Sequence, residues 1–217
     1  MLIGDPTAWL KRFQDVECRM AERLPALWPA CIQGLPGNPR ENEISRRLVV
    51  RLKRDHVVRH IGAIHSQMEL LAEQRSGDVS IKGYLDIAIV LNQDADSYVA
   101  FECKRLNVNT GHGRKSQASS YVKGGMARYL SAQYAQSLPL GIMVGYVLDS
   151  DLEAAARSID AAISGNRKAL SLTGPLARLR AFGFVQRYMS SHGRKGKESD
   201  FEIRHILLPM SPAGLNS

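Results

Sequence analysis

Three ionisable side chains lie inside segments that are otherwise apolar. Asp86 is part of the run YLDIAIVL at residues 84–91, and Glu102 and Lys104 are part of YVAFECKRL at residues 98–106. Side chains alternate between the two faces of a strand, so Glu102 and Lys104 are expected on the same face. Burying charge in this way costs free energy unless other charges compensate it, and a bound cation would compensate the two carboxylates.

Two carboxylates and a lysine at this spacing suit hydrolysis of a phosphodiester bond. That reaction uses a hard metal ion held by oxygen ligands, which neutralises phosphate charge and lowers the pKa of the attacking water. A lysine two residues after the second acid can reach the same water or phosphate. Glu102-Cys103-Lys104 is the one acid-x-Lys triplet in the sequence. A buried salt bridge without chemistry is the alternative explanation of the three residues.

The order helix, Asp86, about 15 intervening residues, Glu102-x-Lys104, helix, strand resembles the PD-(D/E)XK, or restriction-endonuclease-like, nuclease superfamily over residues 41–148. The resemblance implies an α/β fold in which helices flank a central mixed β-sheet. It also implies that Mg²⁺ or Mn²⁺ is bound by Asp86, Glu102 and the backbone carbonyl of Cys103, with Lys104 assisting the attacking water. Leu85 stands where the family motif has proline.

Many members of this superfamily also place a glutamate of the first core helix at the metal site. The helix expected over residues 41–54 carries apolar side chains along one side, at Ile44, Leu48 and Leu52. At about 100° per residue, Glu41 falls on that side and Glu43 points away from it. We therefore predict that Glu41 joins the catalytic and metal-binding residues. An ordinary acidic residue in the first helical turn, favoured by the helix dipole, is the alternative interpretation of Glu41.

Hydrophobic periodicity and turn signals divide the chain into a series of elements. We expect helices at 7–31, 41–54, 121–136 and 151–165, a hairpin of strands at 84–91 and 98–106, a strand at 140–148, and a second hairpin at 182–190 and 201–210. The turn-rich sequence GLPGNP at 34–39 separates an N-terminal helical arm, residues 1–38, from a nuclease domain, residues 39–217, that ends in a C-terminal β-hairpin extension.

A basic loop and the helix after it supply the predicted contacts with nucleic acid, namely Arg114, Lys115, Gln117, Tyr121, Lys123 and Arg128. Gln117 and Tyr121 are similar to the Q-x-x-x-Y element of some exonuclease-like branches of the superfamily. In the alternative interpretation, Tyr129 and Tyr134 belong to the core while Lys123 and Arg128 are solvated. The second basic loop, HGRKGK at 192–197, could equally contact phosphates or be solvated.

The formal net charge of +8 favours a polyanionic partner. The three cysteines are widely spaced, so no disulfide framework or cysteine-rich zinc site is indicated. His56 and His60 are four residues apart, but Val57 stands where the HExxH zinc pattern requires glutamate. The longest apolar run, at 138–148, is too short to span a bilayer. We expect a cytoplasmic protein that does not act at a membrane.

These features together predict a metal-dependent nuclease, with DNA as the expected substrate. Similar small members of the superfamily serve in restriction, phage defence and DNA repair, so the resemblance also implies those roles and a partner protein of such a system. Cutting both strands of a duplex would favour a symmetric homodimer. The alternative is a catalytically inactive nucleic-acid-binding or complex-forming module that kept the fold.

Overall fold

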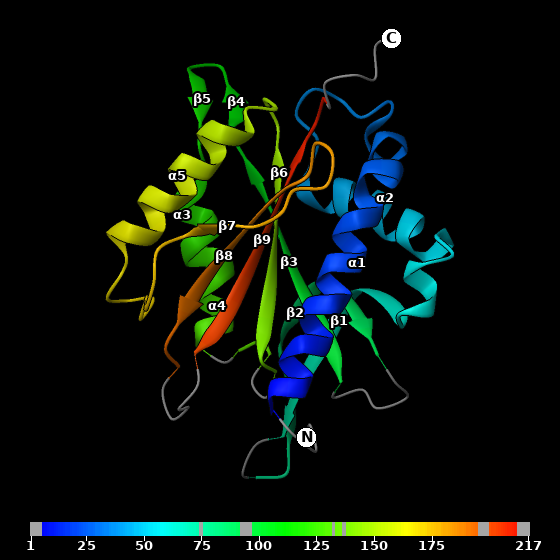
Figure 1. Ribbon diagram of the computed structural model, residues 1–217, viewed down its shortest axis with the longest axis vertical. Coiled ribbons are helices and arrows are strands. Elements are labelled where there is room, and N and C mark those ends of the chain that lie inside the picture. The colour runs from blue at the N-terminus through cyan, green and yellow to red at the C-terminus, as the bar shows by residue number, and fades with distance from the viewer. Residues whose placement is uncertain are drawn as a thin grey trace.

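The computed structural model of the 217-residue chain describes residues 6–73, 76–91, 97–131, 133–135, 138–194 and 200–211. A seven-stranded mixed sheet with the order β1-β2-β3-β6-β9-β8-β7 forms its centre, and helices lie on both sides of the sheet (Figure 1). The expected α/β class, with a central mixed sheet flanked by helices, is confirmed. No helix in the described part of the chain is both long enough and apolar enough to cross a membrane.

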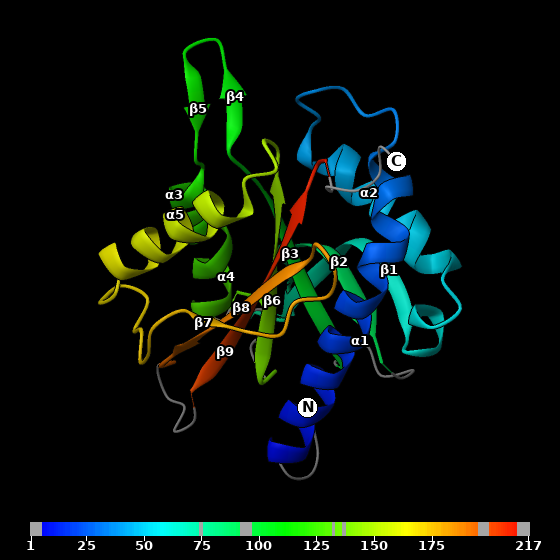
Figure 2. The ribbon, with the colours of Figure 1, turned by 45° about the horizontal axis from the view of Figure 1, so that its top comes forward.

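The three central strands of the sheet are parallel, and the pairs outside them are antiparallel. The strands are β1 (Ala63–Glu73), β2 (Val79–Val90), β3 (Tyr98–Leu106), β6 (Leu140–Val147), β9 (Phe201–Pro209), β8 (Gln186–His192) and β7 (Ala177–Arg178). Every residue of β6 is buried, as expected for a strand covered on both faces. A small hairpin of β4 (Val108–Thr110) and β5 (Gly113–Lys115) projects away from the sheet (Figure 2).

Two groups of helices cover the two faces of the sheet. On one side lie α1 (Pro6–Ile32) and α2 (Glu41–Arg54), followed by the short 3₁₀-helix η1 (Val58–His60). On the other side lie α3 (Ala118–Ser120), the π-helix η2 (Tyr121–Met126), α4 (Ala127–Leu130) and α5 (Leu152–Gly165) (Figure 1). The site residues of β3 therefore have helices next to them on both faces of the sheet.

The N-terminal helix α1 shares the hydrophobic core of the later elements. The Trp28 ring stacks on the Tyr146 ring of β6, and its Nε1 donates to the backbone oxygen of Pro209 at 2.6 Å. Glu17 forms a buried ion pair with Arg187 of β8. The expected helix is confirmed, and it is bound to the sheet by these contacts. The division of the chain into domains at residue 38 stays a prediction.

Several of the expected elements are confirmed. β2 and β3 form the predicted antiparallel hairpin, and β8 and β9 form the second one. The helix expected from Asp151 is α5, and the Asp151 carboxylate accepts a hydrogen bond from the Ala154 amide at 2.9 Å, as an N-cap residue does.

The helix expected over 121–136 is wrong in both its limits and its regularity. Helical structure begins at Ala118, passes through the π-helix η2, and ends at Leu130. The buried Arg194 guanidinium donates to the backbone oxygens of Tyr129 at 2.6 Å and Ala135 at 2.8 Å. Because Arg194 binds these carbonyls, the chain is held in a turn where the predicted helix would have continued.

The strand limits also differ from the prediction. β2 begins at Val79, five residues before the expected start, because it pairs with the unpredicted edge strand β1 along nearly its whole length. β8 begins at Gln186 instead of residue 182, because Phe182 and Val185 exchange backbone hydrogen bonds in a tight turn before the strand starts.

Candidate active site

The four predicted site residues come together around one ammonium group. The Lys104 Nζ lies 2.7 Å from the Glu102 Oε1, 3.1 Å from the Glu41 Oε1 and 4.0 Å from the Asp86 Oδ2. Asp86 comes from β2, Glu102 and Lys104 from β3, and Glu41 from the first turn of α2. Three separate elements thus bring three carboxylates to a single cation.

The Asp86 carboxylate lies at the point where the backbone pairing of β2 with β3 ends. The last paired residues at this end are Ile87 and Phe101. Beyond them, the Asp86 Oδ2 accepts a hydrogen bond from the Cys103 amide at 2.8 Å, so a side chain replaces the strand partner. The other oxygen, Oδ1, accepts from the Gln67 Nε2 at 3.1 Å. Both contacts fix the orientation of the carboxylate toward the end of β3.

Glu41 reaches the site and Glu43 does not, as the helical angles predict. The Glu41 Oε2 accepts a hydrogen bond from the Arg105 amide at 3.1 Å while its Oε1 contacts Lys104. Glu43 pairs instead with Arg47 on the same helix, at 3.8 Å. Glu41 therefore attaches the start of α2 to the end of β3 and holds the lysine at the same time.

Glu102 is the most deeply buried charge of the site. Its side chain is 0% exposed, and its Oε1 accepts from the Arg128 NH1 at 2.7 Å as well as from Lys104. Burial, followed by the neighbouring Asp86 carboxylate, raises the pKa of Glu102 to about 7, although Lys104 and Arg128 both act to lower it. Desolvation therefore outweighs two close cations.

The second oxygen of Glu102 bears on whether a metal ion fits this site. As the side chains stand, no group of three or more His, Cys, Asp or Glu in the described ranges is arranged to hold a metal ion. The Glu102 Oε2, however, is buried and has no hydrogen-bond partner among those same residues. The Cys103 carbonyl faces the site too, since it accepts from the Lys104 Nζ at 2.8 Å. An unpartnered buried oxygen beside further oxygen ligands fits a hard cation.

Two contacts of the site were not expected from the sequence. Arg128 was predicted only as a phosphate contact, yet its guanidinium binds Glu102 and also donates to the Tyr134 hydroxyl at 3.0 Å. That hydroxyl in turn donates to the backbone oxygen of Tyr84 at 2.6 Å. Gln67, which holds Asp86, lies in a strand that was not predicted. A long-range contact of this kind leaves no spacing signal in the sequence.

The predicted nucleic-acid contacts are spread over several environments. Arg114 binds Asp149 at 3.0 Å and Asp151 at 3.3 Å, so carboxylates of the chain itself already hold it. Lys115 is exposed on β5, and Gln117 is partly exposed, with a positive φ of 58°. None of these three residues has a hydrogen bond or ion pair with a site residue in the described part of the chain.

Tyr121 is a correction to the sequence prediction. Its side chain is fully buried, and its hydroxyl lies 3.0 Å from the His205 Nδ1, so it presents no surface to nucleic acid. Lys123 is exposed, whereas Arg128 belongs to the site. Tyr129 and Tyr134 are buried, as the alternative interpretation of this segment predicted. In the second basic loop, residues 195–197 lie outside the described residues.

The comparisons with other proteins assign no family to this arrangement. The chain matches no protein family, no curated protein and no solved structure.

Proposed function

We propose that this protein is a metal-dependent hydrolase of phosphodiester bonds in nucleic acid, with a core of the restriction-endonuclease-like type. The observation that carries the proposal is the pairing of Glu102 and Lys104. A buried carboxylate, one oxygen of which has no partner among the described residues, lies 2.7 Å from a lysine ammonium, and two further carboxylates contact the same ammonium. A simple buried ion pair does not need three acids around one lysine.

Each residue has a distinct role in this proposal. Asp86, Glu102 and the Cys103 carbonyl would hold Mg²⁺ or Mn²⁺. When bound, the metal ion would neutralise charge on the phosphate and lower the pKa of the attacking water. Lys104 carries a positive charge that can orient the nucleophile or stabilise the negative charge that develops on the phosphate.

Glu41 and Arg128 hold the other groups in place. Glu41 positions Lys104 directly and fixes the end of β3 through the Arg105 amide. Arg128 binds the Oε1 of Glu102, which leaves the Oε2 for another ligand. About 40% of the Arg128 side chain is exposed, so its remaining N–H groups can also contact a substrate phosphate.

The net charge of +8 favours a polyanionic substrate, and DNA is the one proposed here. A role in restriction, phage defence or repair, a partner protein from such a system, a homodimer and a cytoplasmic location belong to the same proposal. A catalytically inactive module with this fold would bind nucleic acid and never cut it.

The test is a nuclease assay on plasmid, linear duplex, single-stranded DNA and RNA. Each substrate is incubated with the protein in Mg²⁺, in Mn²⁺ and in EDTA. The proposal expects cleavage that depends on metal and is lost in Glu102→Gln. Binding without cleavage of any substrate in either metal would support the inactive module instead. Cleavage that is equally fast in EDTA would exclude the metal-dependent mechanism.

A further inference from the structure

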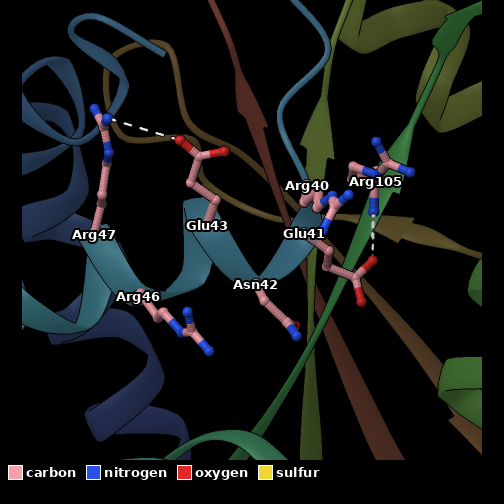
Figure 3. A pocket seen from close by; sticks show the side chains of 7 residues that line it. All are labelled: Arg40, Glu41, Asn42, Glu43, Arg46, Arg47 and Arg105. Atoms are coloured by element: carbon pink, nitrogen blue, oxygen red, sulfur yellow. Dashed lines mark hydrogen bonds and ion pairs between the residues drawn. The ribbon is translucent and has the colours of Figure 1, made fainter. Parts of the chain in front are cut away.

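A hollow lined mainly by arginines adjoins the candidate site on the side of α2. Its volume is about 690 Å³, and its lining residues are Arg40, Glu41, Asn42, Glu43, Arg46, Arg47 and Arg105. Figure 3 shows Arg40 and Arg105 beside Glu41 at one end and Arg46 and Arg47 toward the other. Glu41 lines the hollow and also contacts Lys104 of the site, so the two lie next to each other.

The two acids of the hollow are already engaged, and two of its arginines are not. Glu41 binds Lys104 and the Arg105 amide, and Glu43 lies 3.8 Å from Arg47. Arg40 and Arg46 are exposed, and their side chains make no hydrogen bond or ion pair with any residue in the described ranges. Their guanidinium groups are therefore available to an anion from outside the chain.

Arg105 is oriented toward the hollow by the loop before α2. Its NH1 donates to the Asn38 Oδ1 at 3.1 Å and to the Pro39 backbone oxygen at 3.0 Å. Both acceptors are neutral, so the positive charge of Arg105 is not cancelled. A guanidinium fixed in this way loses little conformational entropy when it binds a phosphate.

The basic surface continues along α2 beyond this hollow. A second hollow shares Arg46 and Arg47 with the first and adds Arg51. At about 1.5 Å per residue, the helix from residue 40 to residue 51 is roughly 16 Å long. One strand of duplex DNA carries a charge about every 3.4 Å along the axis, so this length matches about four or five phosphates.

The two hollows together form a groove that is lined by Arg40, Arg46, Arg47, Arg51 and Arg105. We propose that this arginine groove binds the phosphodiester backbone of nucleic acid and guides a strand past Glu41 to the active site. This path for the substrate rests on the proposed function. Several guanidinium groups in a row recognise repeated phosphates, which a single small anion does not offer. A concave groove next to the proposed active site suits a polymer chain better than a flat membrane surface.

The experiment compares two double variants that each remove two exposed positive charges. Arg40→Ala/Arg46→Ala changes the groove, and Arg167→Ala/Lys168→Ala changes residues just after α5, on the other side of the sheet. Binding of fluorescent duplex and single-stranded DNA is measured by anisotropy in EDTA over a range of salt concentrations. Thermal melting of each variant checks that the fold is intact.

The groove variant is expected to bind at least one of the two DNA forms about tenfold more weakly. The magnitude of the slope of log K against log salt should fall by about 1.4 to 1.8, since each of the two lost phosphate contacts removes about 0.7 to 0.9. The control variant should change affinity less than about threefold. The proposal that the groove binds DNA would be contradicted if both variants bound DNA equally weakly, or if neither bound DNA more weakly than the wild type. Binding to anionic vesicles in place of DNA would contradict it too.

The two proposals fail in different ways in these measurements. Binding in EDTA requires no catalysis, so DNA binding that depends on Arg40 and Arg46 without cleavage in Mg²⁺ would refute the hydrolase and support the groove. Cleavage by the wild type together with normal binding by the groove variant would refute the groove and leave the hydrolase in place.

Discussion

Glu102 concentrates the opposing electrostatic effects of the site in one carboxyl group. Burial and Asp86 raise its pKa, and the two cations that contact it lower its pKa without restoring the ordinary value. Burial therefore makes the ionised form of Glu102 less favourable than it is in water. A further cation at this position would stabilise that ionised form. Perturbed carboxyl groups of this kind are common at functional sites.

The raised pKa of Glu102 gives a pH-dependent prediction for stability. Between its ordinary value of 4.5 and about 7, the folded protein retains a proton that the unfolded chain releases. In EDTA, protonated Glu102 should therefore add to the free energy of unfolding of the wild type at low pH. This contribution should disappear as pH rises toward 7. Glu102→Gln has no proton to release, so its free energy of unfolding relative to wild type should increase across this window.

Urea unfolding of both proteins at pH 5, 6, 7 and 8 measures this difference. Parallel stability curves for wild type and Glu102→Gln would show that the carboxyl group titrates normally in the folded protein, contrary to this account.

Residue spacing predicted which carboxylates contact Lys104. It did not predict that a second cation, Arg128, contacts Glu102. Glu102-x-Lys104 and Asp86 lie in strands whose pattern is readable, and the helical angle selects Glu41 over Glu43. The contact of Arg128 with Glu102 depends on where η2 and α4 pack against β3. No local pattern in the sequence encodes that placement, so only the assembled fold shows it.

At the scale of the elements, the contact between α4 and β6 depends on a glycine. A Cβ built at Gly141 would lie 2.5 Å from a ring carbon of Tyr129. That ring cannot easily move, because its hydroxyl lies 3.0 Å from the backbone oxygens of both Ala100 and Ile142 and shares its one hydrogen between them. The close approach keeps α4, and with it Arg128, against the sheet.

Gly141→Ala should therefore destabilise the protein by about 1–3 kcal/mol, the range typical of overpacking. Gly124→Ala is the matched control, because a Cβ at Gly124 meets nothing within 4 Å and should stabilise the helix by roughly 0.5–1 kcal/mol. Chemical unfolding measures both changes. If Gly141→Ala left the free energy of unfolding unchanged, the Tyr129 ring and β6 would not be in tight contact.

The elements that the sequence did not predict are those without a clear apolar pattern. β1 is an edge strand in which only Ile64 is buried, and its exposed residues include His65, Ser66 and Gln67. In its second half Leu71 is exposed between the half-buried Leu70 and Ala72, so apolar and polar residues do not alternate cleanly along the sequence. β3, β6 and β9, which are more fully buried, were located within one or two residues.

At the scale of the whole molecule, a chain of buried hydrogen bonds joins β8, β9 and η2. The His192 Nε2 lies 2.7 Å from the Ser190 Oγ, which lies 2.9 Å from the His205 Nε2. His205 then contacts the Tyr121 hydroxyl of η2. Burial, aided by His192, lowers the pKa of His205 to about 3, so the imidazole is neutral in the folded protein at neutral pH.

This buried histidine should make the protein sensitive to acid. Below the ordinary pKa of 6.5, His205 is protonated in the unfolded chain. In the folded protein it stays neutral until the pH falls to its lowered pKa of about 3. Stability due to His205 is present above pH 6.5 and is lost as pH falls toward 3. His205→Gln removes this titration, so its free energy of unfolding should fall less steeply between pH 6.5 and 4.

Urea unfolding at several pH values compares wild type, His205→Gln and the control His65→Gln, which changes an exposed histidine. The control should keep the wild-type slope. An equally steep loss in His205→Gln would show that other groups cause the acid sensitivity.

The proposed active site can be tested by the rate of Mg²⁺-dependent DNA cleavage by Lys104→Ala, measured beside wild type and the exposed-lysine control Lys168→Ala. Lys104 is the group that all three carboxylates contact. Its loss should lower the rate by about a hundredfold or more, while Lys168→Ala cuts as the wild type does. A folded Lys104→Ala protein that cuts DNA at the wild-type rate would contradict the proposed active site.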